Sequence, residues 1–245
     1  MSALSYNGHD FSEHVTAELI EPAGHALSPR TLAVPGRPGA VLLGCELPPR
    51  PLVVRLFMDA GVTLTAEERS AIRHEMYGWL VAPAGAELSL SGEPDLTWRD
   101  AVVTGVSDWD SLFEGGSCEV EFTCFDPVAY GDAHELGPVD DAAAIALSVG
   151  GNYRTWPTFT LVAAAGSLVA VEDSASGARI EVERTFTGGE EVLIDCSASK
   201  AWVDDEPADA DVSLESDFFC LEPGMVSFLF EGCAEATLEY VERWL

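Results

Sequence analysis

The feature that most constrains the fold is an alternation of apolar and polar residues with a period of two along most of the chain. Between Ser117 and Phe125, apolar side chains at every second position alternate with polar or charged ones. Successive side chains of a strand point to opposite faces, so this pattern predicts half-buried strands. The same alternation recurs in Leu52/Val54/Leu56, Ile145/Leu147/Val149, Phe159/Leu161, Ile180/Val182, Val226/Phe228/Phe230 and Ala236/Leu238/Tyr240. The chain is therefore predicted to be mainly β.

One segment has a helical pattern instead. Thr65-Ala66-Glu67-Glu68 has the spacing of a capping box, in which the Thr65 hydroxyl and the Glu68 carboxylate cover amides at a helix start. Ile72, Met76 and Trp79 then follow at the spacing of one helical face, with Leu80 directly after them. A single α-helix among many strands is the expectation.

The composition changes near residue 131. Residues 132–141 are polar and rich in turn-forming residues, and strand patterns begin again at about Ala143. We expect an N-terminal domain at 1–131, a linker at 132–141 and a C-terminal β-sandwich at 142–245, because both halves are long enough to fold separately.

The charge balance limits the partners. The 245 residues include 12 Lys and Arg against 42 Asp and Glu, a formal net charge of −30. Such a chain is unsuited to nucleic-acid recognition, which uses basic patches, and to binding an anionic membrane surface. No apolar run approaches the roughly 20 residues of a membrane helix, and the first residues lack the features of a signal peptide. Cys118 and Cys124 are expected to be buried thiols of a protein that folds in a reducing cytosol.

Motifs that carry chemistry are missing from the sequence. The five histidines lack metal-ligand spacing, the six cysteines form no C-x-x-C pair, and nucleophile-elbow and phosphate-loop motifs are missing. The acidic stretch Asp204–Asp217 lacks the spacing of a calcium loop, which favours a solvated surface loop. Trp156 and Trp202 could form a sugar-stacking platform, although such residues are more often core or interface residues. We expect no catalytic residues, no metal and no cofactor, and a binding or structural protein.

Several segments, in their order and spacing, resemble the distal tail protein family of siphophages. The most specific is Val120–Gly131, which is similar to a domain-closing "F-x-C-x-D-P-x-x-Y-G" pattern. Further similar segments are Tyr6–Ser12, Val34–Ala40, Arg50–Val54, Trp79-Leu80, Trp98–Ala101 with Val103 and Gly105, Pro157–Phe159, Leu193–Asp195 and Phe218–Gly224.

This resemblance implies a structural protein of the virion tail tip, assembled in the cytoplasm of the bacterial host. The N-terminal domain would build a ring of six copies, and the C-terminal domain would be a galectin-like β-sandwich. The ring would join the tail-tube protein to a tail-associated hub, lysin or fibre protein. DNA would pass through the central channel without specific binding, and no membrane would be involved. The alternative is a carbohydrate-binding β-sandwich module that contacts host-surface glycans.

The segment around residues 34–44 is the candidate contact between copies. Two prolines stiffen its loop, which lowers the entropy cost of docking, and an apolar run follows. An ordinary hairpin within one chain remains an equally good interpretation. The candidate inter-subunit contacts are Pro35, Arg37, Pro38, Val41, Leu42 and Leu43.

Overall fold

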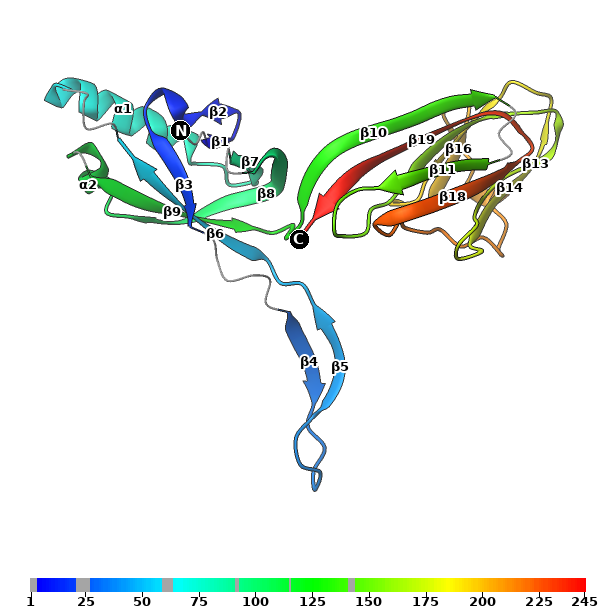
Figure 1. Ribbon diagram of the computed structural model, residues 1–245, viewed down its shortest axis with the longest axis horizontal. Coiled ribbons are helices and arrows are strands. Elements are labelled where there is room, and N and C mark those ends of the chain that lie inside the picture. Colours follow the sequence, from blue (N-terminus) through cyan, green and yellow to red (C-terminus); the bar gives the residue numbers. More distant parts are fainter. Residues whose placement is uncertain (1–3, 21–26, 59–63, 91–92, 115, 141–143) are drawn as a thin grey trace. The chain divides into compact units, whose positions relative to one another are not determined.

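The structure is a computed structural model that describes residues 4–20, 27–58, 64–90, 93–114, 116–140 and 144–245 (Figure 1). Its contacts divide the chain into two compact units, Met1–Tyr130 with Leu245 and Gly131–Trp244. We call these the N-terminal and the C-terminal unit. The predicted mainly-β fold, with a helix-bearing N-terminal part and a β C-terminal part, is confirmed.

One antiparallel sheet forms most of the N-terminal unit. In spatial order its strands are β3 (Thr16–Ile20), β6 (Arg50–Phe57), β9 (Ser117–Cys124), β8 (Glu93–Ser107), β7 (Ala86–Leu90), β1 (Leu4–Tyr6) and β2 (His9–Asp10). The predicted alternation on β6 and β9 is confirmed, because Leu52, Val54 and Leu56 are fully buried and face the buried side chains of β9. The apolar face of each strand therefore supplies the core.

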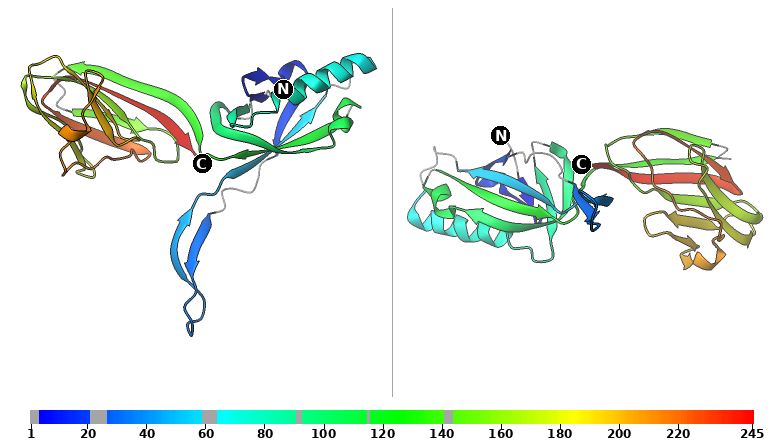
Figure 2. Two further views of the ribbon diagram at one scale, coloured as in Figure 1. Left: turned by 180° about the vertical axis from the view of Figure 1, so that it is seen from behind. Right: turned by 90° about the horizontal axis from the view of Figure 1, so that it is seen from below.

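Helix α1 (Ala66–Trp79) lies against one side of these strands (Figures 1 and 2). The predicted capping box is present: the Glu68 amide donates to the Thr65 hydroxyl, and the Thr65 amide donates to the Glu68 carboxylate. Of the predicted apolar face, Met76 is fully buried and Ile72 is half-buried. The helix begins where its capping residues predict.

The amino-terminal segment packs against the C-terminal end of α1 through contacts with Trp79. The Trp79 ring stacks with the rings of His9 and His14, at centroid distances of 5.0 and 5.6 Å. Phe11, in the short 3₁₀ helix η1 (Phe11–Glu13), meets the same indole edge-on at 5.1 Å. The Asn7 side-chain amide donates to the Trp79 carbonyl. Trp79 thus joins elements that are far apart in the sequence.

A second, short helix was not predicted. Helix α2 (Trp109–Phe113) is too short to show a helical period in the sequence. Arg73 holds it to α1, because its guanidinium pairs with Asp110 at 3.0 Å and lies over the Phe113 ring. Neither α1 nor α2, the α-helices of the described residues, is long and apolar enough to span a membrane.

The C-terminal unit consists of two facing sheets (Figure 1). The first has the order β17 (Glu206–Pro207), β16 (Lys200–Val203), β15 (Glu191–Asp195), β12 (Thr158–Ala163), β19 (Cys233–Trp244) and β10 (Ala129–Asp140). The second has the order β11 (Ala144–Val149), β18 (Gly224–Glu231), β13 (Gly166–Asp173) and β14 (Arg179–Phe186). Phe159 of the first sheet contacts Phe228 of the second, so their alternating apolar faces enclose one core.

The linker prediction for 132–141 differs from the structure. Residues 132–140 belong to β10, which pairs with β19. Asp132 and Glu135 are exposed on this strand, whereas His134 and Leu136 are half-buried. The exposed polar and charged side chains give this strand a composition that resembles that of a loop.

Three buried thiols predict a loss of stability at alkaline pH. Burial is the main cause that raises the pKa of Cys118, Cys124 and Cys196 from 9.0 to about 12. The unfolded chain ionises these thiols above pH 9 while the folded chain keeps them neutral, so stability falls as the pH rises. We expect urea titrations to show that the stability of Cys124→Ala falls by about 1.4 kcal/mol less than that of the wild type over the whole range from pH 8 to pH 10. A matching change for Cys45→Ala, which removes an exposed thiol, would contradict this expectation.

Candidate interaction surface

Residues 27–46 form a hairpin of β4 (Ser28–Leu32) and β5 (Val41–Glu46). Leu32 pairs with Val41, and the loop between them contains the two prolines and two glycines that predict a tight turn. Gly36 and Gly39 adopt φ of +82° and +78°, which only glycine tolerates well. The Arg37 amide donates to the Val34 carbonyl, and Arg30 pairs with Glu46 across the strands at 2.6 Å. The hairpin is thus shaped by its own sequence.

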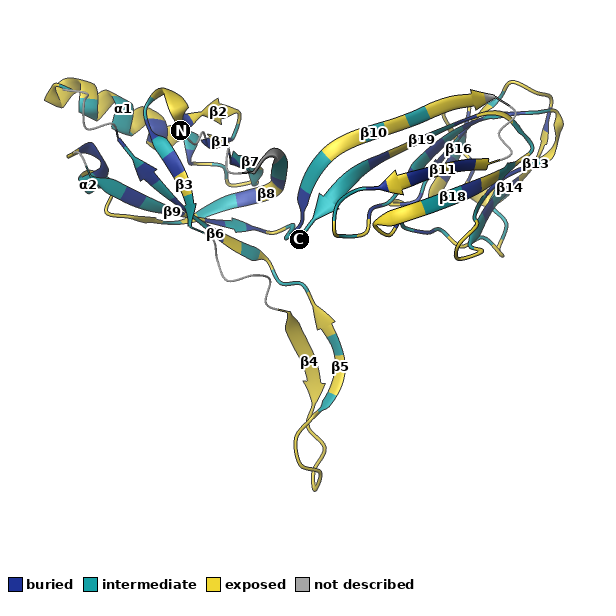
Figure 3. Cartoon of the chain, viewed as in Figure 1, coloured by how far each residue is buried: buried dark blue, intermediate teal, exposed yellow. Residues whose placement is uncertain are grey.

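The hairpin is not covered by the rest of the described chain. Every residue from Leu27 to Ala40 is exposed, which Figure 3 shows as an almost continuous yellow segment. Leu42 and Leu43 follow with 61% and 65% of their surface exposed. The shift in register between Arg30 and Thr31 places Leu43 in a β-bulge. Exposed apolar side chains gathered on one element mark a surface that another molecule covers.

The charge of the hairpin is opposite to that of the chain. Residues 27–46 contain Arg30 and Arg37 against Glu46, a formal charge of +1, so the remaining residues carry −31. Arg37 is exposed at the tip of the turn. The hairpin is therefore both apolar and slightly basic on a strongly acidic protein, and its charge complements an acidic partner.

The structure places the six sequence-predicted contact residues on this one hairpin. Pro35, Arg37 and Pro38 lie in the exposed turn, and Leu42 and Leu43 are exposed on β5, whereas Val41 is half-buried. The sequence prediction missed Leu27 and Leu32, which are 57% and 53% exposed on the other side of the turn. Their apolar character was visible in the sequence, but β4 has no clear alternation that would mark it as a strand.

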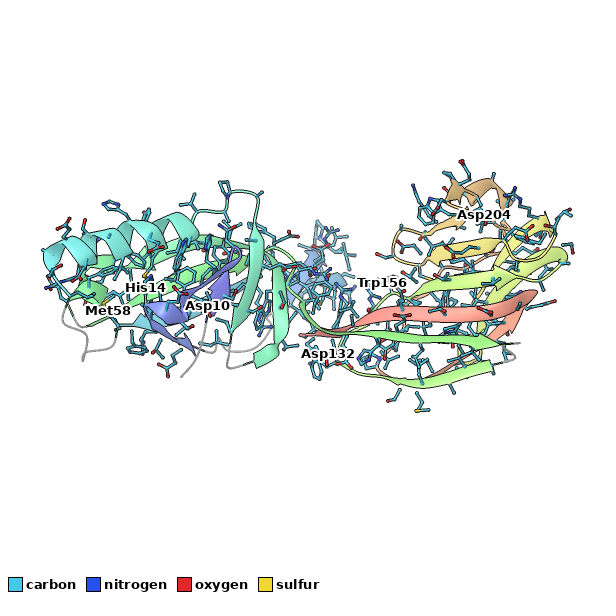
Figure 4. All side chains as sticks on the ribbon, turned by 90° about the horizontal axis from the view of Figure 1, so that it is seen from above. Asp10, His14, Met58, Asp132, Trp156 and Asp204 are labelled. Carbon is cyan, nitrogen blue, oxygen red and sulfur yellow. The ribbon has the colours of Figure 1, made fainter. Side chains whose placement is uncertain are left out.

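The acidic stretch predicted as a surface loop has structural contacts of its own. Asp204, labelled in Figure 4, lies in the turn after β16, and its carboxylate accepts from the Glu191 amide at 3.0 Å. Asp209, in the 3₁₀ helix η2 (Asp209–Asp211), accepts from the Ala201 amide. Among the described residues, no three His, Cys, Asp or Glu side chains are arranged to hold a metal ion. These carboxylates therefore hold their turns against neighbouring strands through hydrogen bonds from backbone amides.

Trp156, the candidate sugar-stacking residue, is engaged within its own unit (Figure 4). The guanidinium groups of Arg154 and Arg243 lie over its ring, 5.6 and 5.0 Å from the centroid. The same two arginines lie over the Tyr153 ring. Trp156 is also packed against the core of the unit. An indole held in this way has less free ring surface for a sugar.

Comparisons with known proteins match both units. Residues 7–124 match the family model of the phage tail protein RIFT-related domain, and residues 150–244 match that of the siphovirus-type tail component, C-terminal domain. The protein is also similar to the solved structure of the SPP1 Dit (gp 19.1) protein. The two structures align over 100% of this chain and 100% of the SPP1 Dit chain, with 16% identity and a TM-score of 0.79. A chain from the structure of the phage p2 baseplate in its activated conformation with Sr aligns with 99% of this chain over 98% of its own length, with 9% identity and a TM-score of 0.47. No curated protein matches the chain.

The fold and these two matches, which together span most of the chain, define a structural component of a phage tail. The chain belongs to the distal tail protein family of siphophages. It is a structural component of the virion tail, and it is not an enzyme.

Proposed function

We propose that six copies of this protein form a ring at the tail tip, with the N-terminal unit building the ring and the hairpin of residues 27–46 joining neighbouring copies. The observation that carries this proposal is the uncovered hairpin, with Leu42 and Leu43 exposed next to a basic turn. In this ring, the hairpin of one copy contacts a different part of the next copy. Such a head-to-tail contact closes into a ring when the rotation between copies fits.

The partners follow from the position in a tail. We propose that one face of the ring contacts the tail-tube protein and the other a tail-associated hub, lysin or fibre protein. The similar SPP1 Dit protein is described as a paradigm of the hub adsorption apparatus in phages that infect Gram-positive hosts. DNA would pass through the central channel, and part of the acidic surface would face it, because carboxylates repel phosphates and keep the DNA from adhering.

The test is the size and shape of the assembled protein as a function of salt. Six copies carry 6 × −30 = −180 formal charges, and salt at physiological strength screens repulsion beyond about 8 Å. We therefore expect light scattering and negative-stain images to show more sixfold rings at 0.5 M than at 0.05 M NaCl. Monomers at every salt and protein concentration, or rings that dissociate as salt is added, would contradict the proposal.

A further inference from the structure

Strand β11 forms one edge of the four-stranded sheet in the C-terminal unit. It pairs antiparallel with β18 in unbroken register, from Ala144 opposite Leu229 to Val149 opposite Gly224. Its other edge has no partner in the parts of the chain that the structure describes. The strand contains no charged residue and no proline, and its pairing has no bulge. Charges, prolines and bulges usually protect an edge strand from pairing with another chain, so this edge is open to it.

The opposite edge of the same sheet, at β14, is covered by the chain itself. The Ser213 amide donates to the Glu181 carbonyl at 2.9 Å. The Asp217 amide donates to the Arg179 carbonyl at 2.9 Å as well. Residues 212–217 thus occupy the edge of β14, whereas β11 has no such cover among the described residues. Of the two edges, β11 is the one that can accept a further strand.

The outward face of this sheet has a charged part and an uncharged part. In the charged part, the Arg179 guanidinium pairs with Glu181 and Glu231 at 3.0 and 2.7 Å. The uncharged part lies over β11 and the adjoining strand β18. We call it the β11–β18 patch, and its outward residues are Ala144, Ala146, Ser148, Met225, Ser227 and Leu229. Residues 132–245 contain 5 basic against 23 acidic side chains, a formal charge of −18, so the patch is a neutral area on an acidic unit.

The β11–β18 patch has room for large side chains beside β11. Met225 lies opposite Ser148, and Leu229 lies opposite Ala144. Because these β11 residues are small, Met225 and Leu229 remain 74% and 45% exposed. A further strand next to β11 would place its outward side chains over the small residues, where large apolar ones would cover Met225 and Leu229. The patch therefore fits an extended segment with large apolar residues at every second position.

We infer that another protein of the tail docks on the C-terminal unit by adding an extended segment as a strand next to β11. The open edge supplies the backbone hydrogen bonds, and the β11–β18 patch receives the apolar side chains. Lysine or arginine beside these apolar residues suits a unit of charge −18, because opposite charges favour the encounter. Pairing of β11 with β11 of a second copy is disfavoured, because it brings two acidic units together. This contact does not depend on the proposed ring.

Peptides test the contact on the full chain. The probe is a fluorescently labelled peptide with alternating apolar residues between two lysines, Lys-Leu-Thr-Val-Thr-Leu-Lys. One control peptide has the same residues with the apolar ones in a block, Lys-Leu-Val-Leu-Thr-Thr-Lys, and a second has the probe sequence with methylated backbone amides. Fluorescence anisotropy should show that the probe binds at least about tenfold more tightly than either control, because only the probe makes both the backbone and the side-chain contacts.

Ala146→Lys and Ala198→Lys are a matched pair of variants. Both alanines are exposed and both substitutions add one positive charge, but Ala146 lies on β11 and Ala198 lies in the turn after β15. Ala146→Lys should weaken binding of the probe about tenfold, because its side chain fills the space next to β11. Ala198→Lys should bind the probe like the wild type. Met225→Ser removes an apolar contact without changing the charge, and it should weaken binding too.

Hydrogen exchange locates the bound probe. The amides of β11 that face the open edge should exchange more slowly when the probe is present. The amides of β3 and of the hairpin should exchange at the same rate with and without it. Light scattering of the three variants without peptide should give the same mass as the wild type, because the assembly of copies does not use β11.

Each outcome decides for or against the docking edge. No binding at about 1 mM, equal binding of the probe and its controls, or equal binding to Ala146→Lys and Ala198→Lys would overturn the inference. Equal binding would show only a general attraction of cationic peptides to an acidic protein. Slower exchange at β3 or β5 without slower exchange at β11 would place the added strand elsewhere and overturn it as well. A smaller assembly for Ala146→Lys than for Ala198→Lys would show that a second copy covers β11.

Discussion

Replacing Leu42 and Leu43 together by serine should abolish ring assembly and leave the thermal stability of the monomer unchanged. The two side chains are 61% and 65% exposed, so the folded monomer loses little when they become polar. In the proposed ring both are covered by the next copy. Burial of one leucine contributes about 2 kcal/mol, so the double variant should lose about 4 kcal/mol in each contact between copies. Because a ring closes only when every contact forms, we expect monomers at protein concentrations that give rings in the wild type.

The matched control is Leu214→Ser. Leu214 is completely exposed in the C-terminal unit and lies outside the hairpin. This variant should assemble like the wild type, as measured by light scattering and negative-stain imaging. Rings formed by the double variant at wild-type concentration would show that the hairpin does not hold the copies together. A lower melting temperature of its monomer would show instead that Leu42 and Leu43 stabilise the folded chain.

Strong local signals made most of the fold predictable. Helix α1 has its own capping residues and fourteen residues over which an apolar face can be recognised. The turn at Pro35–Gly39 was visible because its glycines and prolines restrict the backbone directly. The strands β6 and β9 alternate because one face of each is buried. In each case, the residues that cause the structure lie within the segment itself.

The failures have a different physical cause. The sequence of the polar strand β10 predicts a linker, because this strand owes its place to pairing with β19 and its own residues resemble a loop. The five residues of α2 owe their conformation to contacts with Arg69 and Arg73 of α1. Structure that depends on distant partners leaves little trace in local periodicity.

The candidate surface shows the same limit. The sequence does not show whether an apolar run such as Val41–Leu43 is covered by its own chain or by another copy. The sequence therefore left an intrachain hairpin and a contact between copies equally open. The structure shows that the hairpin forms within one chain and that its leucines stay uncovered. One edge of β3 has no partner among the described residues, and the sequence could not predict this, because it depends on which strand neighbours which.

Phe159→Ala should destabilise the C-terminal unit by about 4 kcal/mol, the typical cost of removing a buried phenylalanine. Phe159 on β12 is fully buried, and its ring contacts those of Phe219, Phe228 and Phe230 at centroid distances of 5.4 to 6.1 Å. Phe228 and Phe230 belong to the opposite sheet, so the cavity would open between the two layers of the sandwich. Urea titration followed by tryptophan fluorescence would measure the loss, because Trp156 and Trp202 lie in this unit.

Phe159→Ala also tests whether the stability of the C-terminal unit is independent of ring assembly by the N-terminal unit. The hairpin belongs to the N-terminal unit, so rings should still form below the unfolding temperature of Phe159→Ala. Phe125→Ala is the matched control: that ring is 57% exposed, and its removal should cost less than about 1 kcal/mol. Equal losses for the two variants would contradict the role of Phe159 in the core. Loss of rings by Phe159→Ala while its C-terminal unit is still folded would place the contact between copies in the sandwich, because only there does this substitution change the packing.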